Sequence, residues 1–253
     1  ILASPDISKF ITVASSHSNL LRGLTFGGGH FVVVGDKGTI LISRDGGVWQ
    51  AGASRTEKSL SAVAHGSGGF VSVGDAGTIL TSSDGSEWVG RNAGTRVILR
   101  GIAYGSGGFV AVGDTGTILT SPDGSEWTTK EALSQKTLKG VAFGSKGYVA
   151  VGDEGTILLS DDGVNWKNAS AVASDLTSVS YCFDRYLTTG ILPSPEKSLK
   201  MHRRVFVSTD GERWSAMSME ESLPLLGVAC GSNRTLVVVG KKIIQSDALP
   251  EAK

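Results

Sequence analysis

Hydrophobic and polar residues alternate along most of this chain in short runs that end at glycine-rich turns. The segment LRGIAYGSGGFVAVGDTGTILTSPDGSEW, at 99–127, illustrates the pattern, because apolar and β-branched residues alternate and Gly or Asp-Gly pairs separate the runs. No segment repeats its apolar residues with the 3.6-residue period of an amphipathic helix. The pattern predicts an all-β fold of short antiparallel strands.

The same pattern recurs at a spacing of 39 residues. Four blocks begin at Leu21, Leu60, Leu99 and Leu138, and less regular copies begin at Leu176 and Leu225. Each block predicts four strands, and four antiparallel strands in about 40 residues match one blade of a β-propeller. One such sheet cannot bury both of its faces alone, whereas stacked sheets bury each other. Small residues in the first strand place it innermost, and the polar fourth strand is predicted to be outermost.

We therefore expect a single β-propeller domain over residues 1–253, with six four-stranded blades. The predicted blades span about 21–59, 60–98, 99–137, 138–175 and 176–224, and a closing blade combines 225–253 with 1–20. The first residues of the chain align with a degenerate copy of the hairpin formed by the third and fourth strands of a block, in which Phe10 stands at the position of the tryptophan. A seven-bladed ring, with one blade missing from this chain, is the alternative.

A second signal is the sequence SxDGxxW at the turn between the third and fourth strands. The aspartate is suited to accept backbone N–H groups in a tight turn, glycine supplies a positive φ, and tryptophan packs between blades. This favours a structural turn, and the alternative is that the repeated Asp and Trp bind sugar or metal. The five pairs are Asp45 and Trp49, Asp84 and Trp88, Asp123 and Trp127, Asp162 and Trp166, and Asp210 and Trp214.

The SxDGxxW turn resembles the Asp-box of the bacterial neuraminidase repeat. The whole blade pattern, VGDxGTILxSxDGxxW, is similar to the repeat of the photosystem II stability and assembly factor family, over about residues 20 to 215. The first resemblance implies a propeller in which the box is a structural turn. The second implies assembly or accessory work on a larger complex, membrane-bound complexes included, outside the cytoplasm. That family is seven-bladed.

Antiparallel order divides the connections of a blade between two faces. We call the edge with the GDxGT turns and the blade-to-blade connections the GDxGT face, and the edge with the first-to-second turns and the SxDGxxW turns the SxDGxxW face. The fifth block is longer by roughly ten residues on the GDxGT face, and its insertion has a local charge of +3. The basic candidates for partner binding there are Lys197, Lys200, His202, Arg203 and Arg204.

A second basic group consists of Arg22, Arg100 and Lys139, each the second residue of a first strand. These side chains either ring the mouth of the channel and attract an acidic partner, or pair with the acidic turns on the same face. The acidic turn residues are Asp36, Asp75, Asp114, Asp153 and Glu154.

Composition narrows the function. The chain has 24 basic and 24 acidic residues, and this zero net charge disfavours nucleic-acid binding. The chain contains no run of about 20 apolar residues, so the sequence does not predict insertion into a membrane. The four histidines, His17, His30, His65 and His202, lack metal-ligand spacing, and no nucleophile elbow or phosphate loop occurs. We expect no catalysis, no metal and no cofactor.

Cys182 and Cys230 either form one bridge or remain as two buried thiols. Both fall at strand positions that other blocks fill with Gly, Tyr or Phe, which favours thiols.

For the whole chain, the regular repeat without a catalytic set favours a non-enzymatic scaffold that binds a protein partner. The alternatives are a glycan-binding or sialidase-like propeller and a structural subunit of a cell-surface assembly.

Overall fold

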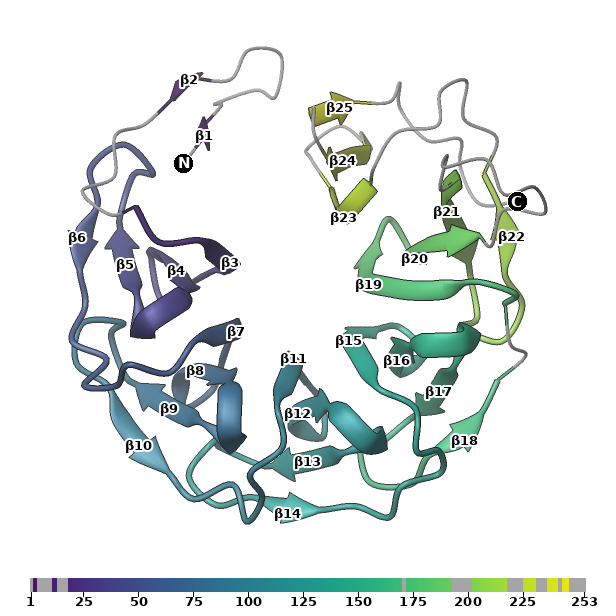
Figure 1. The fold of residues 1–253 in the computed structure, drawn as a ribbon, viewed down its shortest axis with the longest axis horizontal. Coiled ribbons are helices and arrows are strands. Elements are labelled where there is room, and N and C mark those ends of the chain that lie inside the picture. The colour runs from purple at the N-terminus through teal and green to yellow at the C-terminus, as the bar shows by residue number, and fades with distance from the viewer. Residues whose placement is uncertain are drawn as a thin grey trace. The chain divides into compact units, whose positions relative to one another are not determined.

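The computed structural model describes residues 2–3, 11–12, 18–169, 172–192, 202–217, 225–230, 236–240 and 243–245. In this part of the chain, regular structure consists of β-strands, and short turns with 3₁₀-type hydrogen bonds but a left-handed middle residue lie at Asp36–Gly38, Asp75–Gly77, Asp114–Gly116 and Asp153–Gly155. The strands form five four-stranded antiparallel sheets, together with one three-stranded and one two-stranded sheet (Figure 1). The prediction of an all-β fold is confirmed.

The five complete sheets keep the strands in chain order. The first contains β3 (Leu21–Gly27), β4 (His30–Gly35), β5 (Ile40–Ser43) and β6 (Gln50–Ala51), and the second contains β7 (Leu60–Gly66), β8 (Gly69–Gly74), β9 (Ile79–Ser82) and β10 (Val89–Arg91). The third contains β11 (Leu99–Gly105), β12 (Gly108–Gly113), β13 (Ile118–Ser121) and β14 (Thr128–Thr129). The fourth contains β15 (Leu138–Gly144), β16 (Gly147–Gly152), β17 (Ile157–Ser160) and β18 (Lys167–Asn168), and the fifth β19 (Asp175–Cys182), β20 (Arg185–Leu192), β21 (His202–Ser208) and β22 (Ser215–Ala216).

The chain divides into two compact units, Ile1–Gln135 and Lys136–Lys253. In the first unit the innermost strands β3, β7 and β11 are neighbours, and in the second unit β15 contacts β19, which contacts β23 (Leu225–Cys230). Apolar side chains fill the space between successive sheets, for example Val32 and Ile42 of the first sheet with Phe70 and Trp88 of the second. This packing explains why the innermost strands carry small residues, since a Cβ on Gly23 would lie 3.0 Å from Ala62 Cα.

A β-bulge recurs near the start of every innermost strand. The ladder of β11 with β12 skips Arg100, and that of β3 with β4 skips Arg22. The same shift occurs in β15, where Lys139 is skipped. A bulged residue is free of the alternation that the ladder imposes on its neighbours. The bulge thus sets the place of the three basic side chains on the GDxGT face.

The GDxGT turns are two-residue hairpin loops with a left-handed backbone. In the third sheet, Thr115 and Gly116 both have positive φ, at 55° and 69°. The Thr117 N–H donates to the carbonyl of Asp114 at 3.1 Å and closes the turn. This is the type I′ geometry that suits the right-handed twist of a hairpin.

Cys182 is disulfide-bonded, and the described residues include no free cysteine. The prediction of buried thiols was therefore wrong. The chain has one other cysteine, Cys230, whose side chain lies outside the described residues. Cys182 and Cys230 end the innermost strands β19 and β23, as the seventh residue of one block and the sixth of the next, and these two strands are in contact. These two positions face each other in other neighbouring sheets, where a Cβ on Gly27 would overlap His65 and one on Gly66 would overlap Tyr104, so a strand-by-strand interpretation overlooks the bridge.

The two ends of the chain form separate small sheets. The head is an antiparallel pair of β1 (Leu2–Ala3) and β2 (Ile11–Thr12). The tail is a three-stranded sheet of β23, β24 (Leu236–Gly240) and β25 (Ile243–Gln245). Closure of one blade from both ends, and with it the count of six blades, stays a prediction.

Candidate functional site

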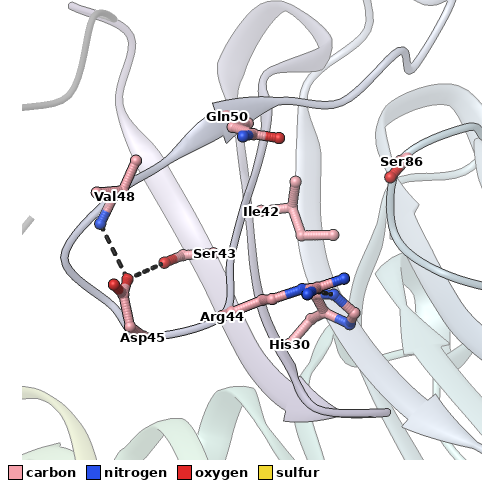
Figure 2. A pocket seen from close by; sticks show the side chains of 8 residues that line it. All are labelled: His30, Ile42, Ser43, Arg44, Asp45, Val48, Gln50 and Ser86. Carbon is pink, nitrogen blue, oxygen red and sulfur yellow. Dashed lines mark hydrogen bonds between the residues drawn. The ribbon is translucent and has the colours of Figure 1, made fainter.

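The SxDGxxW turn is a closed network of local hydrogen bonds. In the first sheet, Ser43 Oγ donates to Asp45 Oδ1 at 3.1 Å, and the same oxygen accepts the N–H of Val48 at 3.0 Å (Figure 2). The indole Nε1–H of Trp49 donates to the carbonyl of Gly46 at 2.9 Å. Each of the named polar side chains is thus used inside its own turn.

All five turns repeat this geometry. In every copy the aspartate Oδ1 accepts a backbone N–H, and the tryptophan Nε1–H donates to the turn glycine at 2.8–2.9 Å. Backbone N–H groups hold the pKa of Asp45, Asp84, Asp162 and Asp210 below its usual value. A carboxylate that is stabilised as an anion by its own backbone is a structural element. This geometry favours the structural interpretation over sugar or metal binding.

The turn also joins neighbouring sheets. A Cβ on Gly85 would lie 2.9 Å from Ile42 of the preceding sheet, and one on Gly124 would lie 2.7 Å from Val71. Trp88 is 2% exposed because the connection after β6 crosses it, where the Ala53 N–H donates to the carbonyl of Ser86 at 2.8 Å. In the second and third sheets, the SxDGxxW turn thus packs against the sheet before it.

On the GDxGT face, the three basic residues of the bulges form ion pairs with the aspartates of their own turns. Arg22 Nε lies 2.5 Å from Asp36 Oδ1, and Arg100 also pairs with Asp114, where Nη2 and Oδ2 are 3.2 Å apart. Lys139 pairs with Asp153. The side chains of Arg22, Arg100 and Lys139 keep 29–43% of their surface exposed.

The pairing has an electrostatic signature in the first sheet. The hydrogen bond from Arg22 holds the pKa of Asp36 below its usual value. In the structure, the two arginines and the lysine therefore pair with the aspartates of the acidic turns, which is the second of the two interpretations of this basic group. A partner on this face would meet ion pairs at these three positions.

The insertion of the fifth block is partly an extension of its hairpin. Strands β20 and β21 gain three ladder pairs beyond those of the other sheets, namely Gly190 with Arg204, Ile191 with Arg203 and Leu192 with His202. Arg204 is exposed. Lys197 and Lys200 lie outside the described residues, as do the side chains of His202 and Arg203.

A basic cavity of about 420 Å³ on the GDxGT face was not predicted. It lies between the connection 54–58 and strand β10, and its charged lining consists of Arg55, Lys58 and Arg91. Arg55 pairs with Glu87 at 2.9 Å. Lys58 and Arg91 are exposed and have no acidic partner among the described residues. These residues fall at positions that vary between repeats, so the repeat pattern gave no signal for them.

A second cavity, of about 410 Å³, opens on the SxDGxxW face of the first unit (Figure 2). It lies between the hairpin of β5 and β6 and the turn that contains Ser86. Arg44 Nε–H donates to His30 Nε2 at 3.2 Å, and His30 Nδ1–H donates to the carbonyl of Gly28 at 3.0 Å. Among the described residues, no group of three His, Cys, Asp or Glu side chains is placed to hold a metal.

Several solved structures share this fold. The chain aligns with a structure described as YCF48 bound to D1 peptide at 18% identity and a TM-score of 0.68, over 96% of this chain and 82% of that one. The WD40 domain of Neurospora crassa Pan2 aligns at 14% identity and a TM-score of 0.66, over 89% of this chain and 74% of that one. The chain is a β-propeller.

A structure of YCF48 from Cyanidioschyzon merolae is also similar to this propeller, at 15% identity and a TM-score of 0.57, over 93% of this chain and 97% of that one. No family model matches the chain, and no curated protein matches it. The described part of the propeller contains no helix long and apolar enough to cross a bilayer. At these identities the comparisons establish the fold.

Proposed function

We propose that this propeller is a non-enzymatic scaffold that binds a protein partner through its GDxGT face and acts in the assembly or maintenance of a larger complex, membrane-bound complexes included. The similarity to YCF48 bound to a D1 peptide supports a peptide or protein ligand. The resemblance of the blade sequence to the photosystem II stability and assembly factor repeat supports accessory work on a complex.

The observation that carries the proposal is the exposed positive charge on the GDxGT face. In the first unit, Lys58 and Arg91 line the basic cavity without an acidic partner among the described residues. In the second unit, considered by itself, Arg204 is exposed on the extended hairpin. The chain as a whole has zero net charge, so this charge is local. Local complementarity of this kind steers an acidic partner and selects against basic ones.

The described chemistry supports a role without catalysis. A general acid or base needs a pKa near the working pH, and the shifted aspartates all move to lower values, away from neutrality. Burial raises the pKa of Tyr186 to about 12, and its hydroxyl donates to the carbonyl of Gly147 at 2.8 Å. These groups are held in one protonation state by the fold.

The disulfide of Cys182 supports a location outside the cytoplasm. Structural disulfides persist in the periplasm, in lumenal compartments and at cell surfaces, whereas cytosolic thiols are kept reduced.

The test is quantitative capture of partners from the native host with the full chain, followed by mass spectrometry. We expect the double variant Lys58→Glu and Arg91→Glu to lose the partner that the unmodified chain captures. The matched control is the double variant Lys146→Glu and Arg213→Glu, which makes the same charge change at two exposed residues on the SxDGxxW face and should retain the partner. Equal capture by all three chains would contradict the docking face, and turnover of a fluorogenic sialoside would contradict the absence of catalysis.

A further inference from the structure

The cavity on the SxDGxxW face is built from residues that depart from the repeat. His30 stands where the next three blocks have Gly69, Gly108 and Gly147, and Arg44 stands where they have Ser83, Pro122 and Asp161. The first block is thus the one among these four that places a guanidinium and an imidazole together. Two contacting residues that both differ from an otherwise regular repeat indicate a function specific to this block.

The hydrogen bonds of His30 fix the orientation of the pair. Nε2 accepts from Arg44 and Nδ1–H donates to the carbonyl of Gly28, so both ring nitrogens are occupied. The imidazole accepts a hydrogen bond from Nε–H of Arg44 alone. The two terminal amino groups of the guanidinium therefore remain available to a ligand. Figure 2 shows Arg44 and His30 on the side toward Ser86, and Asp45 on the side toward Val48.

Hydrogen-bonding capacity remains in this cavity. Among the described residues, the terminal amino groups of Arg44, the hydroxyl of Ser86 and the amide of Gln50 have no side-chain hydrogen-bond partner. Arg44 also has no carboxylate within ion-pairing distance in the described part of the chain, whereas six other basic residues there form ion pairs. Asp45 is turned to its own backbone, where Oδ1 accepts from Gly47 and Val48.

We propose that this cavity binds the carboxylate of a peptide segment from a second protein. A fixed guanidinium binds a carboxylate in bidentate fashion, and the Ser86 hydroxyl and Gln50 amide supply further neutral donors. The single positive charge, with Asp45 at the far side, suits a monoanion better than a doubly charged phosphate. Ile42 and Val48 provide an apolar wall for an aliphatic neighbour of the carboxylate. The volume of about 410 Å³ is within the range of ligand pockets.

The carboxylate has two sources, a chain terminus or an Asp or Glu side chain. Three labelled probes separate them by fluorescence anisotropy with the full chain: a Gly-Gly-Val-Ala peptide with a free C-terminus, the same peptide amidated, and an amidated Gly-Asp-Val-Ala peptide. Binding of the first probe alone assigns a chain terminus, and binding of the third assigns an acidic side chain. Either result supports the proposal.

Substitutions toward the repeat sequence test the site with little risk to folding. Arg44→Ser, which restores the residue of the second block, should weaken binding roughly tenfold or more because a charge-assisted pair is lost. His30→Gly should weaken it less, and His30→Gln should restore it in part, since the glutamine oxygen accepts from Arg44. Arg213→Ser, at an exposed arginine of another SxDGxxW turn, is the matched control and should bind as the unmodified chain does.

Three results would overturn the proposal. These are the absence of binding by every carboxylate probe at millimolar concentration, equal binding by the Arg44→Ser and Arg213→Ser variants, and tighter binding of a phosphoserine peptide than of the carboxylate probes. The site is on the face opposite Lys58 and Arg91 within the first unit. Its failure would leave the capture experiment on the GDxGT face unaffected.

Discussion

Substitution of Thr115 by asparagine should stabilise this propeller, because the native turn holds a β-branched residue in a strained backbone conformation. Thr115 has φ 55° and ψ 32°, which is the left-handed region. For a residue with a Cβ atom this region costs about 1–2 kcal/mol, and β-branched residues are among the least suited to it. Asparagine tolerates the left-handed region and is preferred in type I′ turns with glycine in second place.

The magnitude follows from what Thr115 contributes now. Its side chain is exposed, and its hydroxyl makes one hydrogen bond, to the carbonyl of Asp114 at 2.7 Å. Loss of that bond costs about 0.5 kcal/mol, so relief of the strain leaves a net gain of about 1 kcal/mol in the free energy of unfolding. For a domain of this size, that gain raises the thermal midpoint by about 2–4 °C.

The assay is thermal unfolding by calorimetry, supported by urea unfolding followed through tryptophan fluorescence. The control is Gly116→Ala in the same turn, where φ is also positive and a Cβ would overlap the carbonyl oxygen of Ser134. That change should lower the free energy of unfolding by more than about 2 kcal/mol. A lower or unchanged midpoint for Thr115→Asn would refute the assignment of strain to this turn.

Three further predictions concern the disulfide and two titrating groups. Cys182→Ser should lower the free energy of unfolding by about 2–4 kcal/mol in calorimetry, and addition of reductant should lower the midpoint of the unmodified chain but not of the variant; a reductant effect of equal size in both would contradict the bridge. Backbone N–H groups lower the folded pKa of Asp84, so the stability that its carboxylate contributes is fully present above about pH 4 and is lost as the pH falls through the lowered pKa. Asp84→Asn should therefore flatten the decline of the thermal midpoint between about pH 5 and pH 2. An unchanged slope would count against this role of Asp84. Burial raises the pKa of Tyr186 to about 12, so its contribution to stability is present below about pH 10 and is lost as the pH rises toward 12; Tyr186→Phe should remove the corresponding step from an ultraviolet titration.

Local signals carried most of the fold. The run GFVAVG predicts strand β12 because its apolar residues alternate, and the Asp-Thr-Gly that follows predicts the hairpin turn, so both boundaries are encoded within a few residues. The position of the bulge is different. It depends on a one-residue mismatch between β11 and β12 at Arg100, and such a mismatch leaves no trace in the alternation of either strand.

The candidate sites were harder to predict, because they combine residues that are distant in the chain. Arg44 and His30 are 14 residues apart, and their contact requires the hairpin pairing of β4 with β5. Ser86 joins them from the next sheet. The bridge at Cys182 was missed for the same reason: Cys182 is the seventh residue of its block and Cys230 the sixth of the next, and only the packing of neighbouring sheets shows that these two positions face each other.

Polar residues that recur in every blade of this propeller differ from those that do not in whether the fold already occupies their hydrogen-bonding groups. Ser43 and Asp45 recur in every complete blade, and their oxygens are occupied by the turn that they build. Asp36 and Asp114 recur as well, and both are paired with bulge arginines. A residue that every blade needs for folding has little hydrogen-bonding capacity left for a ligand.

Capacity therefore remains where a blade departs from the pattern. Arg44 adjoins the serine and aspartate of its turn, yet its terminal amino groups have no partner among the described residues. Lys58 and Arg91 stand at positions that vary between blocks, where Val97 and Gly52 are among the equivalents, and they lack acidic partners among the described residues. If the same division holds for binding, neutral substitutions at Arg44, Lys58 and Arg91 should change ligand affinity with thermal midpoints nearly unaltered. Substitution of Asp162, which builds the same turn in a blade that contributes to neither cavity, should lower the thermal midpoint and leave ligand affinity nearly unaltered.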